Sequence, residues 1–194
     1  MYGVRKQTII RGISIVLCLI ALWGYLIPVM GISIVALNRT VRSMDVNIGN
    51  AISFRDELED MFKVTESSDS ALPALLGSEG YAEIEGKLTV FAGLYLAALV
   101  LLVILLLLLL ANKPVKKNAV ISVAALASFI YMGYTISNLA GDIIGILEQR
   151  IGFLSPHVDL QKMVNVTLEN GFWLTIIAIG CLVVAQIKGA LEAE

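Results

Sequence analysis

The sequence predicts an all-α, polytopic membrane protein with four antiparallel transmembrane helices, whose extensions form a short helical bundle outside the cytoplasm. Of its 194 residues, 58% are hydrophobic and only 15% are charged, whereas a soluble domain carries about 25% charged residues. The stretch 88–111 holds no charge and ends in six consecutive leucines. At about 1.5 Å per residue, such a helix crosses a hydrocarbon layer of ~30 Å.

The first predicted span covers residues 13–37 and follows Arg5, Lys6 and Arg11. An apolar run of this length is too long for the core of a signal peptide, so we expect it to stay attached as a helix. Pro28 lies inside it and cannot donate a helical hydrogen bond, which predicts a kink. Trp23 and Tyr25 then fall in mid-span and are expected to pack against other helices.

The segment after this span has the spacing of an amphipathic helix, which would continue the first span beyond the membrane. Its apolar residues recur at intervals of three, four or multiples of these, at Val41, Met44, Ile48, Ile52, Leu58 and Phe62. Residues 63–80 are rich in serine, glycine and acidic residues, and this composition predicts a surface loop. The whole extracytoplasmic segment is 38–87.

The remaining spans are predicted at 88–111, 119–137 and 172–188, with a cytoplasmic turn at 112–118. An apolar stripe continues the third helix as far as Ile151, and Ser155-Pro156 is typical of a helix start. The second extracytoplasmic segment is therefore 138–171. We expect the extensions of the first, third and fourth helices to pack together as a bundle. The alternative is that they lie flat on the lipid surface.

The charges divide between the two predicted sides. The termini and the 112–118 turn hold seven basic and two acidic residues, and the other side holds seven basic and fourteen acidic residues. The positive-inside rule then places both termini in the cytoplasm of a cell-membrane protein. An acidic outer face gathers Asp56, Glu57, Glu59 and Asp60. We interpret this face as solvated, and the alternative is a vestibule that concentrates cations at a pore mouth.

The sequence offers few groups for catalysis or cofactor binding. The one histidine, His157, lies in the predicted outer turn, and both cysteines, Cys18 and Cys181, lie inside apolar runs. These placements disfavour haem, copper and iron centres. No ionisable residue falls in mid-span, which disfavours a proton-coupled carrier. We therefore expect no enzymatic activity, no cofactor, no metal and no nucleic-acid partner.

A stripe of small residues on the third helix is the most specific signal. Gly133, Ser137, Gly141 and Gly145 are spaced by four, and such stripes let helix backbones approach closely in membranes. The spacing leaves open whether the stripe faces helices of its own chain or a neighbouring subunit. We hypothesise a non-enzymatic membrane subunit or accessory protein that acts through helix–helix association as a homo- or hetero-oligomer. The alternative is a homo-oligomeric channel with an acidic outer vestibule.

Overall fold

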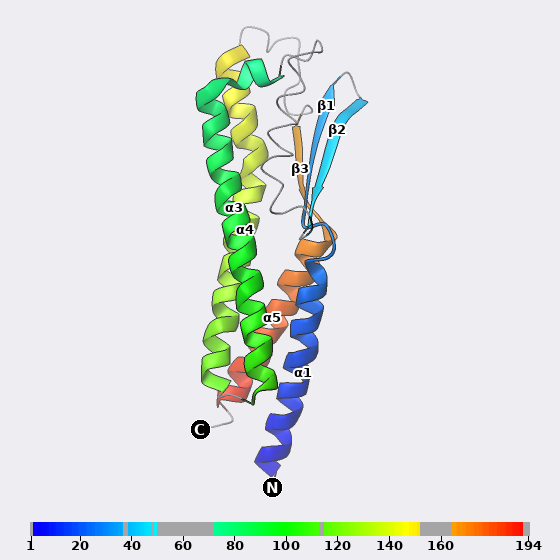
Figure 1. Ribbon diagram of the computed structural model, residues 1–194, viewed down its shortest axis with the longest axis vertical. Coiled ribbons are helices and arrows are strands. Elements are labelled where there is room, and N and C mark those ends of the chain that lie inside the picture. The colour runs from blue at the N-terminus through cyan, green and yellow to red at the C-terminus, as the bar shows by residue number, and fades with distance from the viewer. Residues whose placement is uncertain are drawn as a thin grey trace. The chain divides into compact units, whose positions relative to one another are not determined.

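The computed structural model describes residues 2–36, 39–47, 49, 72–112, 115–151 and 164–191. Within these ranges, four helices and three strands follow one another (Figure 1). They are α1 (Tyr2–Gly24), β1 (Met30–Ala36), β2 (Arg39–Val46), α3 (Leu72–Leu110), α4 (Val115–Ile151), β3 (Val164–Leu168) and α5 (Asn170–Leu191).

The structure confirms four helices that are long and apolar enough to cross a membrane. Their apolar windows are Lys6–Gly24, Ala82–Leu110, Lys117–Ile146 and Asn170–Leu191. The windows in α3 and α4 hold 29 and 30 residues, and those in α1 and α5 hold 19 and 22. The helices α3 and α4 therefore extend beyond the predicted spans 88–111 and 119–137, whereas α1 and α5 are short.

The prediction of a helix over 13–37 is wrong in its second half, because α1 ends at Gly24 and β1 begins at Met30. Pro28 does not kink a longer helix but lies in the connection between helix and strand, where its missing N–H costs nothing. The early end also moves Trp23 from mid-span to the last turn of α1. Trp23 is 63% exposed, so the expectation that it packs against other helices is wrong, whereas Tyr25 is buried against Tyr95 and Phe129 as expected.

The class is mostly helical rather than all-α, because strands stand at 39–46 and 164–168, where the sequence predicts helical extensions. Most of the other residues of these two extensions lie outside the described part of the chain. The strand order is β2-β1-β3, with Met30 opposite both Val46 and Leu168. The strands are rich in β-branched residues, for which a pleated surface suits the stiff side chains better than a helix does. Apolar spacing alone had favoured helices over 38–62 and 156–171.

The chain divides into two compact units, which are described separately. The first comprises Met1–Val29, Gly93–Met132 and Asn170–Glu194, and the second comprises Met30–Ala92 and Gly133–Glu169. The first unit contains α1, α5 and the adjoining parts of α3 and α4. The start of α1 and the end of α5 lie at the same end of this unit (Figure 1).

An aromatic cluster, defined as Tyr25, Tyr95, Phe129 and Phe172, lies in the core of the first unit. The ring centroids of Tyr25 and Tyr95 are 4.6 Å apart, and Phe129 lies 5.7 Å from both Tyr25 and Phe172. Each tyrosine hydroxyl donates to the backbone carbonyl of the other tyrosine over 3.3 Å. The cluster thus joins segments from all four helical regions of the unit, with both buried hydroxyls satisfied.

The end of α1 meets the start of α5 at two glycines of the same unit. The Gly171 N–H donates to the Pro28 carbonyl over 2.9 Å. A Cβ on Gly171 would lie 2.5–2.7 Å from three backbone carbonyl oxygens. A Cβ on Gly24 would collide with the Thr175 hydroxyl, which itself donates to the Ala21 carbonyl over 3.3 Å. Only residues without a side chain permit this approach.

Candidate functional site

The small-residue stripe of α4 lies in the second unit and is only partly covered by its own chain. Gly133 is buried, Gly145 is half-buried, and Ser137 and Gly141 are exposed. No heavy atom of the described residues lies within 4 Å of where a Cβ would stand on Gly141 or Gly145. Among the described residues, the two glycines therefore accommodate no neighbouring helix.

The side chains of the stripe need no hydrogen bond from a partner helix. The Ser137 hydroxyl donates to the Gly133 carbonyl over 2.8 Å, within its own helix. A serine bonded in this way behaves as a small residue that a second helix can approach closely. At Ser137 and Gly141 the surface therefore consists of small residues, and the serine hydroxyl already has its hydrogen-bond partner within α4.

Packing between α3 and α4 in the second unit uses other residues. A Cβ on Gly80 of α3 would lie 2.5 Å from the Ile146 Cγ2 atom, so Gly80 is the glycine that this approach requires. Lys87 of α3 forms an ion pair with Asp142 of α4 at 2.7 Å and one with Glu83 at 3.1 Å. The stripe is thus distinct from the contact that holds the two helices together.

The structure gives less support for a functional role of the other residues considered in the sequence analysis. The acidic face Asp56, Glu57, Glu59 and Asp60 lies outside the described residues, as does His157. Among the described residues, no group of three or more histidine, cysteine, aspartate or glutamate side chains is placed to hold a metal ion.

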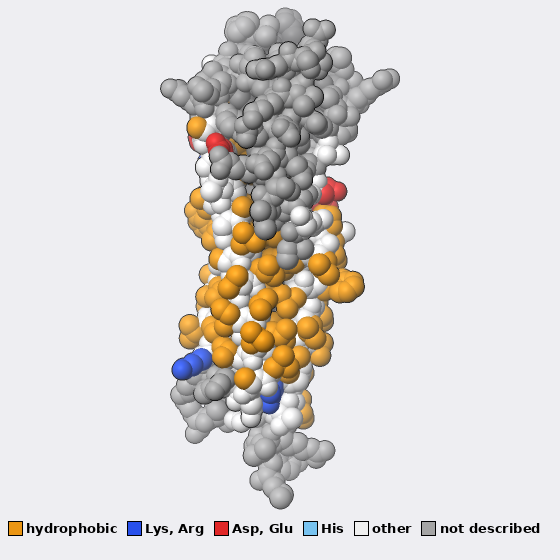
Figure 2. Space-filling view, in the orientation of Figure 1, with side chains coloured by type: hydrophobic (Ala, Val, Ile, Leu, Met, Phe, Trp, Pro, Cys, Tyr) orange, Lys and Arg blue, Asp and Glu red, His pale blue; other side chains and the backbone are white. Residues whose placement is uncertain are grey.

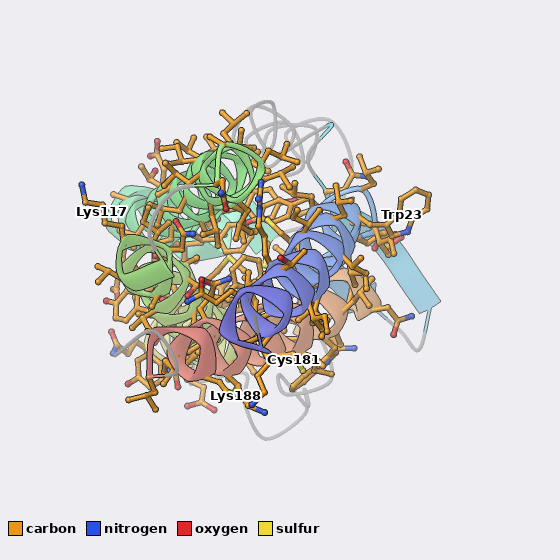
Figure 3. All side chains as sticks on the ribbon, turned by 90° about the horizontal axis from the view of Figure 1, so that it is seen from below. Trp23, Lys117, Cys181 and Lys188 are labelled. Carbon is orange, nitrogen blue, oxygen red and sulfur yellow. The ribbon has the colours of Figure 1, made fainter. Side chains whose placement is uncertain are left out.

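Both cysteines are free, and they differ in surroundings. Cys18 is buried and donates to the Leu102 carbonyl over 3.3 Å, whereas Cys181 lies exposed on α5 (Figure 3).

Arg11 has a structural role that its charge alone does not reveal. Its guanidinium donates to the carbonyls of Leu109 and Leu110 at 2.5 and 2.7 Å and to the Asn112 side-chain oxygen at 2.8 Å. These carbonyls end α3, and Asn112 adopts the left-handed conformation with φ 55°. The cation therefore caps the negative end of the α3 dipole and fixes α1 to the turn that follows.

We expect Arg11→Met to lower the free energy of unfolding by about 2–3 kcal/mol, because three charge-assisted hydrogen bonds and a helix cap disappear together. Detergent-solubilised protein titrated with sodium dodecyl sulfate and followed by circular dichroism measures the loss. Lys6→Met is the control, since Lys6 is exposed on the same helix. An equal loss in both variants would show that net charge, and not the cap, matters.

Gln186 forms a second interhelical contact that the sequence did not predict. It is 1% exposed, and its amide Nε2 donates to the Ser14 hydroxyl over 2.6 Å, which joins α5 to α1. Ser14 in turn donates to the Ile10 carbonyl over 2.9 Å. A polar residue near the end of an apolar run was the available signal, because such residues turn toward other helices when their surroundings are apolar.

No family model matches the chain, and neither a curated protein nor a solved structure matches it.

Proposed function

We propose that this protein is a four-span membrane subunit that associates with a helix of another subunit through the exposed stripe on α4. Its four helices cross the bilayer as an antiparallel bundle, with both termini and the turn after α3 on the cytoplasmic side of the cell membrane. Its role is to assemble a larger membrane complex, without catalysis of its own.

The membrane location is supported by the surface of the helices. Large apolar side chains are exposed on all four of them, including Ile13, Val100, Val123 and Ile177. On the face shown in Figure 2, hydrophobic side chains cover the helical part of the first unit, with basic side chains at its lower margin. Water would disfavour such a surface, and hydrocarbon would not.

The orientation is supported by the basic residues. Arg11, Lys117 and Lys188 all belong to the first unit, at the end where α1 begins and α5 finishes, and Lys117 and Lys188 point away from the helices (Figure 3). Basic residues that flank spans favour the cytoplasmic side.

The open stripe is the observation that carries the association. Gly141 and Gly145 leave space on α4 that no described residue of the chain fills. Small residues at intervals of four let the backbones of two helices approach closely, which favours their association. A glycine face that no described residue of the chain covers fits a helix supplied by another protein.

The experiment compares Gly141→Leu with Gly86→Leu in the protein purified from its native membrane in mild detergent. Both positions are exposed and helical, and a Cβ atom at either would meet no described atom within 4 Å. We expect Gly141→Leu to weaken the association about tenfold or more and Gly86→Leu to leave it unchanged, because only the first closes the stripe. Size-exclusion chromatography with light scattering measures the assembly.

The composition of the assembly then separates the two functions. A different protein that co-purifies with the wild type and is lost with Gly141→Leu supports the accessory subunit. A closed ring of identical subunits supports the homo-oligomeric channel instead. An assembly that survives Gly141→Leu unaltered contradicts the role of the stripe.

A further inference from the structure

Three exposed aromatic side chains mark one end of the first unit. Trp23, Tyr131 and Trp173 are 63%, 55% and 51% exposed. Each lies within two residues of a ring in the aromatic cluster, and the rings of that cluster touch one another. The three exposed side chains therefore lie at one level of α1, α4 and α5, and we name them the aromatic collar. Exposed tryptophan and tyrosine side chains favour the boundary between hydrocarbon and headgroups.

Three basic side chains mark the opposite end of the same unit, and we name Arg11, Lys117 and Lys188 the basic collar. The contact between Gln186 and Ser14 places Lys188 close to the level of Arg11. Lys117 lies in the first turn of α4, directly after the turn that Arg11 binds. Charged groups at this level set the other boundary of the hydrocarbon.

The two collars lie closer together than an ordinary bilayer requires. Between them α1 rises about 18 Å, α4 about 21 Å and α5 about 22 Å. The hydrocarbon of a typical bilayer is ~30 Å thick. Lysine side chains can extend toward the headgroups and add a few ångströms, but the Arg11 guanidinium is held at the end of α3 by three hydrogen bonds. The lower boundary is therefore fixed on α1.

The upper boundary has little room to move outward along the chain, because only residues 24–29 separate Trp23 from the first strand. β1 begins at Met30, six residues after the end of α1, and its neighbour β2 carries Arg39, Arg42 and Asp45. Glu169 directly precedes α5. Charged strands with open sheet edges are not tolerated in hydrocarbon. The short helices α1 and α5 thus limit the hydrocarbon, even though the apolar windows of α3 and α4 are longer.

We propose that the lateral surface of the first unit fits a thin hydrocarbon layer of about 20 Å. The protein accordingly gathers short-chain lipids or thins the bilayer around itself. The partner is the lipid surface, recognised by the distance between the two collars. This inference rests on the membrane location given under the proposed function. It does not depend on the association through the α4 stripe.

The test uses the full-length protein in vesicles of dimyristoleoyl, dioleoyl or dierucoyl phosphatidylcholine, and in mixtures of these lipids. The chain has two tryptophans, Trp23 and Trp173, both in the aromatic collar, so their fluorescence reports on the lipid directly around it. Brominated analogues of each lipid quench this fluorescence on contact and give relative binding constants. Trp23→Phe and Trp173→Phe separate the two signals, and bromines placed near the headgroup or near the chain end give the depth.

We expect dimyristoleoyl phosphatidylcholine to be favoured over dioleoyl phosphatidylcholine by at least about twofold, and dierucoyl phosphatidylcholine to be disfavoured further. Both tryptophans should be quenched best by bromines near the headgroup. A preference for dioleoyl phosphatidylcholine, or equal binding of all three lipids, overturns the thin-layer inference while leaving the membrane location intact. Absence of quenching in every lipid overturns both, because the helices would then lie outside the bilayer.

Discussion

Gly171→Ala is expected to lower the free energy of unfolding by about 3 kcal/mol, a large effect for a single methyl group. The new Cβ would lie 2.5 Å from the Ile27 carbonyl oxygen, 2.6 Å from that of Pro28 and 2.7 Å from that of Gly24. All three are backbone atoms, so no side chain can rotate away. The methyl group must push apart the end of α1 and the start of α5, and the hydrogen bond from Gly171 to Pro28 would be strained with them.

Gly180→Ala is the matched control for this prediction. Gly180 lies on the same helix, and no described atom lies within 4 Å of its would-be Cβ. Alanine there should stabilise the helix by about 0.5–1 kcal/mol, because it lowers the backbone entropy of the unfolded chain. Sodium dodecyl sulfate titration followed by circular dichroism compares both variants with the wild type. If Gly171→Ala is as stable as Gly180→Ala, the close approach between α1 and α5 is not present in the protein.

The number of apolar helices was predictable because the signal was length without charge. An uncharged apolar run as long as 88–111 is typical of a membrane-spanning helix, so composition alone was enough to predict it. The end of the first helix was not predictable in the same way. The run 13–37 stays apolar across Gly24 and Pro28, and hydropathy does not distinguish an apolar helix from an apolar strand such as β1.

The strands were missed because their own pattern is ambiguous. β2 holds Val41 and Met44 at a helical spacing, yet its pairing with β1 places Asp45 opposite Gly31 in an extended ladder. That pairing joins segments whose alignment depends on the turn between them, and β3 joins the same sheet from more than a hundred residues away. Such long-range pairing has no signature in a local window.

The candidate site was predictable in part. Spacing by four placed Gly133, Ser137, Gly141 and Gly145 on one stripe, but it did not tell which of them the chain itself covers. That depends on where α3 crosses, and the crossing uses Gly80, for which no sequence pattern indicates such a contact. The cap formed by Arg11 was hidden for a similar reason, since its partners are backbone carbonyls at the end of another helix.

The aromatic cluster suggests the second large effect, because Phe129 is its shared member. We expect Phe129→Ala to lower the free energy of unfolding by about 3 kcal/mol. Phe129 is fully buried, with Tyr25 on one side and Phe172 on the other, each 5.7 Å away between centroids. In the membrane location that we propose, lipid is as apolar as the core, so the loss arises from the cavity and from missing contacts.

The control for Phe129→Ala is its neighbour in the sequence. Ile130 is 56% exposed, so Ile130→Ala should change the free energy of unfolding by no more than about 0.5 kcal/mol. Both variants are titrated with sodium dodecyl sulfate, and the near-ultraviolet circular dichroism of the tyrosines reports on the cluster. Phe129→Ala should reduce this signal before global unfolding, since Tyr25 loses an edge-to-face neighbour. Equal stability of the two variants would mean that Phe129 faces lipid and that the four helical regions do not meet at this cluster.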